Sequence, residues 1–202
     1  MVRVAFTMIE LIFAIVIIGI TVISLPMMTQ ATSKGIEDNL VQEAIFAASA
    51  ELNLAVTAHW DENSIEPGST DTLARVINTG LCNNITKLRP GHISQPLHRR
   101  CLDSSATPIA SSNTGAVDAL EDAAHGSKNI FTTTITDQAG YKKKYNSVVT
   151  VTPSAIFDGA NNQNMKKITV TIFDTEIPPN IVTVLNTYSA NIGEVDYYKR
   201  SY

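Results

Sequence analysis

The residues that could perform chemistry are few and widely separated along this chain. The sequence contains no nucleophile elbow, no metalloprotease histidine pair and no phosphate-binding loop. Its four histidines, His59, His92, His98 and His125, are isolated from one another, and we interpret each as a surface or loop residue. We therefore expect neither an enzyme activity nor a cofactor.

The two cysteines, Cys82 and Cys101, form the first candidate site. In an oxidising compartment an isolated pair of this kind most often forms a disulfide. His92 and His98 lie between the cysteines, so zinc binding is the alternative, but the spacing matches no compact zinc-finger pattern. The sequence favours the disulfide.

An oxygen-rich run after residue 157 is a weak calcium candidate, with Asp158, Asn161 and Asn164 as its ligands. The run lacks the acidic residues and the bidentate glutamate of an EF-hand loop. An ordinary Asn/Gly turn that joins two strands is the favoured interpretation, and no metal site is predicted.

Glu10 is the most informative residue, because it is the only charged side chain between Phe6 and Leu25. These twenty residues would form a helix of roughly 30 Å, which is long enough to cross a bilayer. A charge at the centre of a bilayer costs about 2.5–3.5 kcal/mol, and less near the interface. An acid within such a run therefore predicts a functional role and a positively charged partner.

The residues around Glu10 resemble a known signal. Ala5-Phe-Thr-Met-Ile-Glu-Leu11, preceded by Arg3 and followed by the apolar run, is similar to the class III signal of type IV prepilins and type II secretion pseudopilins. The resemblance implies that a prepilin peptidase cleaves between Ala5 and Phe6 and methylates the new amine of Phe6. It also implies that Glu10 pairs with that amine on a neighbouring subunit during assembly. The family usually has glycine where this chain has Ala5.

The same resemblance implies a function and a location. The chain would be a structural subunit, most simply a minor pseudopilin, of a filament assembled at the bacterial inner membrane. Its partners would be other pilin-like subunits and a membrane platform with a cytoplasmic ATPase. Because Arg3 precedes the apolar run and the next cation is Lys34, we expect a cytoplasmic N terminus and a periplasmic head.

Other functions are compatible with the same residues. The chain could be a major or minor type IV pilin for adhesion, motility or DNA uptake. It could also be a membrane-anchored periplasmic binding protein or enzyme whose start mimics a prepilin. A cleaved secretory signal is disfavoured, because the apolar run is too long and no small-x-small site follows Leu25.

Composition supports an exported head rather than a nucleic-acid-binding protein. The 202 residues carry a net charge of −4, so no overall basic field attracts nucleic acid. We interpret the local basic runs at 99–100 and 142–144 as solvated turns or strand faces. The residues beyond the membrane segment suffice for one globular domain.

The predicted organisation is an α+β fold in which a long N-terminal helix packs on a C-terminal antiparallel sheet. We divide the chain into a leader (1–5), a transmembrane and assembly helix (6–25), an amphipathic helix that continues into the head (26–60), a loop-rich region with the disulfide (61–128) and the sheet (129–202). Pro26 is expected to kink or locally open the helix.

The finer elements follow from periodicity. In the amphipathic helix Glu51 is expected on the face opposite an apolar stripe. The stripe consists of Leu40, Val41, Ala44, Ile45, Ala48, Leu52, Ala55 and Val56. Short helices are expected at 72–79 and 117–124. Runs of β-branched residues bounded by turn residues predict four strands, at 129–137, 144–153, 166–174 and 180–189. In the third strand, alternation places Ile168, Val170 and Ile172 on one face.

Overall fold

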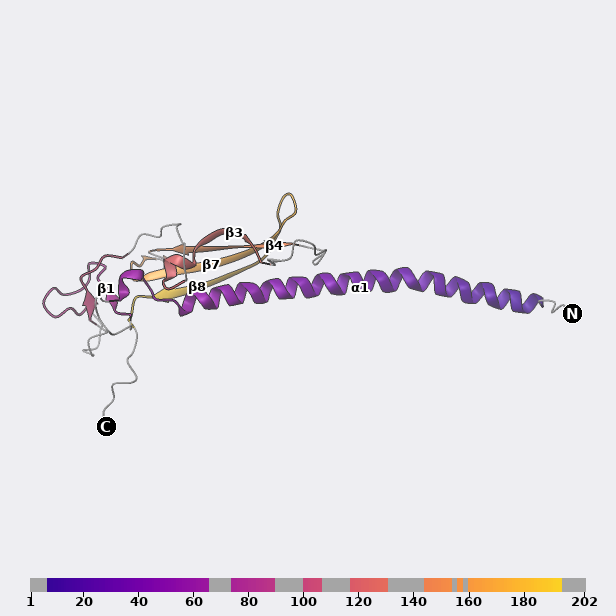
Figure 1. Cartoon of the computed structure of the whole chain (residues 1–202), viewed down its shortest axis with the longest axis horizontal. Helices are drawn as coiled ribbons and strands as arrows, with labels where there is room; N and C mark the ends of the chain where they lie inside the picture. The colour runs from indigo at the N-terminus through magenta and orange to yellow at the C-terminus, as the bar shows by residue number, and fades with distance from the viewer. Residues whose placement is uncertain are drawn as a thin grey trace, which may run out of the picture. The chain divides into compact units, whose positions relative to one another are not determined.

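The computed structural model of the protein describes residues 7–65, 74–89, 100–106, 117–130, 144–153, 156–157 and 160–193. The chain divides into two compact units, residues 1–43 and residues 44–202, and each is described separately here. Figure 1 shows the long helix α1 and the strands of the head. The α+β layout predicted from the sequence is confirmed.

Helix α1 extends from Met8 to Thr57 without interruption. Pro26 lies inside it, so the helix does not open at this residue as the sequence suggested. Proline lacks an amide hydrogen, and the carbonyl of Val22 therefore loses the backbone donor that an ordinary residue would supply. A kink at Pro26 stays a prediction.

The head contains a four-stranded antiparallel sheet with the order β3-β4-β7-β8, which is a meander in chain order (Figure 1). Its strands are β3 (His125–Asn129), β4 (Tyr145–Thr152), β7 (Met165–Asp174) and β8 (Ile181–Ala190). The last three lie close to the predicted ranges. The first strand was predicted at 129–137, but β3 ends at Asn129, and residues 131–137 lie outside the described residues.

Smaller elements surround this sheet. Strands β5 (Ile156–Phe157) and β6 (Ala160–Asn161) pair antiparallel and lie between β4 and β7 in the chain. The short helix predicted at 72–79 is wrong, because β1 (Val76–Ile77) lies there and pairs in parallel with β2 (Cys101–Leu102). The helix predicted at 117–124 is a 3-10 turn, η3 (Leu120–Ala123), and another 3-10 turn, η1 (Glu62–Ser64), follows α1.

Buried and less buried side chains alternate along β4 and β7, and the buried ones form one face of the sheet. Ile168, Val170 and Ile172 are fully buried, as the alternating sequence predicted. They pair across the strands with Val151, Val149 and Ser147, so inward-facing side chains are directly opposite one another. Since register in a sheet is fixed by which face is apolar, these pairs specify the alignment of the two strands.

The head portion of α1 faces the sheet with small side chains. Ala44, Ala48 and Ala55 are fully buried. Ile45 and Val56 were predicted to belong to the same stripe but are exposed, so the buried stripe is narrower than the sequence indicated. The alanines let the helix backbone lie close to the sheet, because they add little volume between the two layers.

Glu51 also belongs to this buried side of α1, which corrects its predicted position on the opposite face. Its Oε1 accepts a hydrogen bond of 2.9 Å from the Ser147 hydroxyl of β4. Its Oε2 lies 3.7 Å from Nε2 of His125 on β3. The spacing of 44, 48, 51 and 55 places Glu51 in line with the alanines on a helix with 3.6 residues per turn.

We predict that Ile172→Ala lowers the free energy of unfolding of the head by about 2–4 kcal/mol, because a buried aliphatic side chain is replaced by a cavity. Trp60 is the single tryptophan of the chain and is buried, so its fluorescence can follow thermal or denaturant unfolding. The matched control is Thr171→Ala, on the other face of the same strand, with an expected change of about 0.5 kcal/mol or less. Equal effects of the two substitutions would contradict the assigned core.

Candidate functional site

The first candidate site is the N-terminal half of α1, which is apolar on all sides. Its side chains from Met8 to Met28 are exposed except that of Ala14, which is half-buried. The most apolar 18-residue window has a mean hydropathy of 2.7, and none of it is buried within the described chain. By length and composition α1 is able to span a membrane. Apolar surface of this extent needs lipid or other apolar helices around it.

The hydroxyl groups in this segment are satisfied by the helix itself. Thr21 Oγ1 donates to the carbonyls of Ile17 and Ile18 at 3.1 and 2.9 Å, and Ser24 Oγ donates to Thr21 O at 2.9 Å. Beyond the proline, Thr29 Oγ1 donates to Pro26 O at 2.9 Å. Such bonds remove the need for water, and the segment therefore suits an apolar environment.

Glu10 lies in the first turn of α1 and its side chain is exposed. The first turn is closed by hydrogen bonds from the amides of Glu10 and Leu11 to Thr7 O, at 3.1 and 3.3 Å. A carboxylate at this end of a helix interacts favourably with the positive end of the helix dipole. Ala5 and Phe6 lie outside the described residues, so the cleavage site and the Phe6 amine stay predictions.

The two cysteines of the head form the predicted disulfide. Sγ of Cys82 and Sγ of Cys101 are bonded at 2.10 Å, with the Cα atoms 6.4 Å apart. Both sulfurs are thereby unavailable to zinc, which removes the alternative interpretation of this pair. The disulfide joins the start of β2 to the turn at 83–87, where Cys101 N also donates to Lys87 O at 2.8 Å.

Asn164, one of the calcium candidates, has a structural role instead. Its Oδ1 accepts hydrogen bonds from Thr79 Oγ1 at 2.9 Å, Arg89 Nη1 at 2.8 Å and Asn191 Nδ2 at 3.0 Å. An oxygen surrounded by three donors is not available to a cation. Asp158 lies outside the described residues, and within the described ones no cluster of three acidic, histidine or cysteine side chains could hold a metal.

The same network anchors the disulfide region to the sheet through Asn191 and Arg89. The fully buried Asn191 side chain accepts from Ile77 N at 2.9 Å and donates to Ile77 O at 2.8 Å, as a neighbouring strand would. Arg89 Nη2 donates to Asn191 O. Partial burial lowers the pKa of the Arg89 guanidinium from its ordinary value, because desolvation disfavours the charged form.

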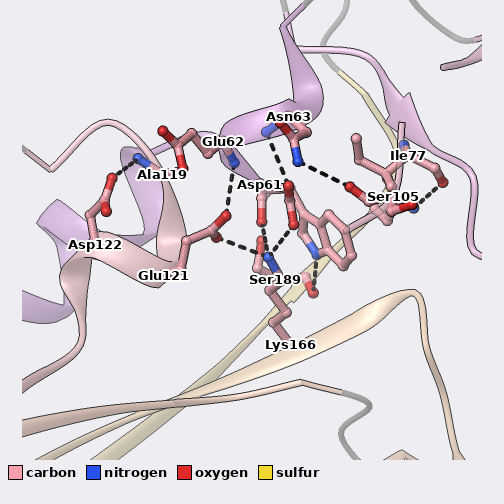
Figure 2. Close-up of polar contacts among 12 residues, drawn as sticks. Asp61, Glu62, Asn63, Ile77, Ser105, Ala119, Glu121, Asp122, Lys166 and Ser189 are labelled. Carbon is pink, nitrogen blue, oxygen red and sulfur yellow. Dashed lines mark hydrogen bonds and ion pairs between the residues drawn. The ribbon is translucent and has the colours of Figure 1, made fainter. Parts of the chain in front are cut away.

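The second candidate site is a buried cluster of three charged side chains, shown in Figure 2. Nζ of Lys166 on β7 lies 3.1 Å from Oδ2 of Asp61 and 3.0 Å from Oε2 of Glu121. Lys166, Asp61 and Glu121 are 2%, 0% and 3% exposed. One cation thus faces two carboxylates in the interior, where isolated charges are costly.

Neighbouring groups complete the cluster. Lys166 Nζ also donates to Trp60 O at 2.6 Å and lies 4.1 Å from the centre of the Trp60 ring. Asp61 Oδ1 accepts from Asn63 N at 3.0 Å, and Glu121 Oε1 accepts from Glu62 N at 2.8 Å. Figure 2 shows that the 3-10 turn after α1 supplies these two amides. The cluster joins the end of α1, η3 and β7.

Sequence reasoning did not identify this cluster, although one signal for it was present. Lys166 lies two residues before Ile168 on the same strand, so it is on the same face as Ile168, Val170 and Ile172. Alternation of inward and outward side chains along the strand therefore places Lys166 on the buried face. A lysine at an inward position requires an acidic partner. Asp61 and Glu121 could not be assigned, because both lie in irregular segments far away in sequence.

Comparisons of this chain with models of protein families, with curated proteins and with solved structures find no match. The resemblance at the N terminus therefore rests on residues 3–25 alone.

We predict that replacing Cys82 and Cys101 with serine lowers the stability of the head by roughly 3 kcal/mol, since the disulfide closes a loop of 19 residues. Thermal unfolding followed by Trp60 fluorescence, with and without reductant, measures the effect. Reductant should lower the transition of the wild type and leave that of the double variant unchanged. A wild-type transition insensitive to complete reduction would contradict the assignment.

Proposed function

We propose that this chain is a structural subunit of a pilus-like filament assembled at the bacterial inner membrane, and specifically a minor pseudopilin of a type II secretion system. The N terminus faces the cytoplasm, α1 crosses the inner membrane and the head lies in the periplasm. The subunit itself catalyses no reaction in secretion.

One observation carries the proposal: the exposed apolar part of α1, from Met8 to Met28, has a single acid, Glu10, in the first turn, and the helix continues into a folded head. A simple membrane anchor needs no acid at this position beyond its favourable interaction with the helix dipole. A subunit that packs its helix among other helices has a use for it, because a carboxylate placed in apolar surroundings pairs only with a cation at one defined position. The amine of Phe6 on a neighbouring subunit, exposed by cleavage after Ala5, would provide that cation.

The energetics of assembly agree with this role. Moving the helix from lipid into a bundle of helices exchanges one apolar environment for another, so apolar contacts contribute little net free energy. A polar pair can then decide the register between subunits. Assembly would be driven by the cytoplasmic ATPase and the membrane platform, and directed by Glu10.

The proposal predicts that Glu10→Ala reduces incorporation into filaments by on the order of a hundredfold, because breaking a buried ion pair costs about 3–5 kcal/mol. Membrane insertion should be unaffected. Sheared or cross-linked filaments, quantified by immunoblot against total membrane protein, provide the measurement.

Two matched variants sharpen this test. Glu10→Asp retains the charge and should retain partial assembly, whereas Glu43→Ala removes an exposed acid later in the same helix and should assemble normally. Normal assembly of Glu10→Ala would contradict the filament role and favour a plain anchor. Loss of piliation rather than of exoprotein secretion, on deletion of the gene, would favour a pilus subunit over a pseudopilin.

A further inference from the structure

We propose that Lys166 and Asp61 condense to form an intramolecular amide bond, with Glu121 as the catalytic base. This inference concerns the head alone and does not depend on the filament proposal. It rests on the buried cluster of Figure 2, which the filament proposal leaves without a role.

The reacting groups are already in contact. Lys166 Nζ, a nucleophile when neutral, lies 3.1 Å from Oδ2 of the Asp61 carboxyl group. Both side chains are held by the fold and almost completely buried. Fixing two reactants at this separation converts a bimolecular condensation into a unimolecular one, with effective concentrations far above any attainable in solution.

The second carboxylate has the position that a proton carrier needs. Glu121 Oε2 accepts from Lys166 Nζ at 3.0 Å, while Glu121 Oε1 is held by the amide of Glu62 at 2.8 Å. It can therefore remove a proton from the attacking nitrogen and deliver it to the departing oxygen.

The Asp61 carboxyl group is also held in a position suited to attack by the Lys166 nitrogen. Its Oδ1 accepts a hydrogen bond from Asn63 N at 3.0 Å, so a backbone amide points at the oxygen on which negative charge develops. Donors fixed in advance at such an oxygen stabilise the tetrahedral intermediate. Oδ2, which faces Lys166, is then the oxygen that leaves.

The step balances without any external reagent. A proton passes from the Lys166 ammonium to Oδ2 of Asp61, giving a neutral amine and a carboxylic acid. The Nζ–Cγ bond forms as Glu121 takes a proton from the nitrogen. The Cγ–Oδ2 bond breaks as Glu121 returns that proton to Oδ2, which already carries the first proton and leaves as water, and one hydrogen stays on the amide nitrogen. Glu121 ends as the carboxylate it was at the start, and no electron is transferred.

Condensation replaces the buried ammonium of Lys166 and the buried carboxylate of Asp61 with a neutral amide. Glu121 stays a carboxylate, and its Oε1 keeps the hydrogen bond from Glu62 N. The released water can leave to bulk solvent. The bond would tie the segment directly after α1 covalently to β7, so that force along the helix reaches the sheet without unfolding the connection.

Peptide mapping of the purified full-length protein tests the proposal. After denaturation, reduction and alkylation, we expect one cross-linked species that contains both Asp61 and Lys166 and lacks one water, with no tryptic cleavage after Lys166. Recovery of Asp61 and Lys166 in separate, unmodified peptides from fully folded protein would overturn the proposal. This measurement needs no variant, so it stands even if substitutions in the cluster prevent folding.

Three variants test the assigned roles. Lys166→Arg should abolish the cross-link, and Lys167→Arg, a neighbouring lysine on the same strand, should leave it unchanged. Glu121→Gln should slow its formation by about a hundredfold or more, as expected when a general base is lost. A Glu121→Gln protein that folds by Trp60 fluorescence and cross-links at the wild-type rate would overturn the role of Glu121.

Discussion

One constraint dominates this molecule: within the part of the chain that the structure describes, the apolar surface of α1 between Met8 and Met28 is uncovered, and apolar surface of this extent favours association with lipid or with other apolar helices. The hydroxyl groups of Thr21 and Ser24 donate to carbonyls of the same helix, so these side chains need no water in an apolar environment. Lipid and a bundle of similar helices are both adequate surroundings. In the proposed filament subunit the helix would use both in turn, and Glu10 would distinguish the assembled state by its pairing.

The head holds a small sheet, a helix and a loop-rich region together although it has few large apolar side chains to bury. Alanines on α1 and alternating aliphatic residues on β4 and β7 form the core. The disulfide and the fully buried Asn191 then attach the region around β1 and β2, which has little apolar surface of its own. The cluster around Lys166 fastens the end of α1 to the sheet, where force transmitted along the helix would arrive.

Sequence periodicity was sufficient to predict the helices and strands whose apolar residues recur regularly. It failed for elements whose structure depends on contacts with residues far away in the sequence. The long helix, strands β4, β7 and β8 and the inward set of Ile168, Val170 and Ile172 were all predicted, because their patterns are local. The region before β3 was misassigned, since a two-residue strand such as β1 has no periodicity and exists only through its pairing with β2. Glu51 was placed on the wrong face because its partners, Ser147 and His125, lie on strands far away in sequence. The disulfide could be predicted because the sequence contains one isolated pair of cysteines.

The central claim is that the apolar helix begins a mature filament subunit rather than a permanent anchor. Mass spectrometry of the N-terminal peptide from protein purified out of its native membrane tests this most directly. The account predicts a chain that starts at Phe6, carries a methyl group on its amine and retains Glu10 as the fifth residue. A chain that retains residues 1–5, or that is cleaved after the apolar run, would contradict it.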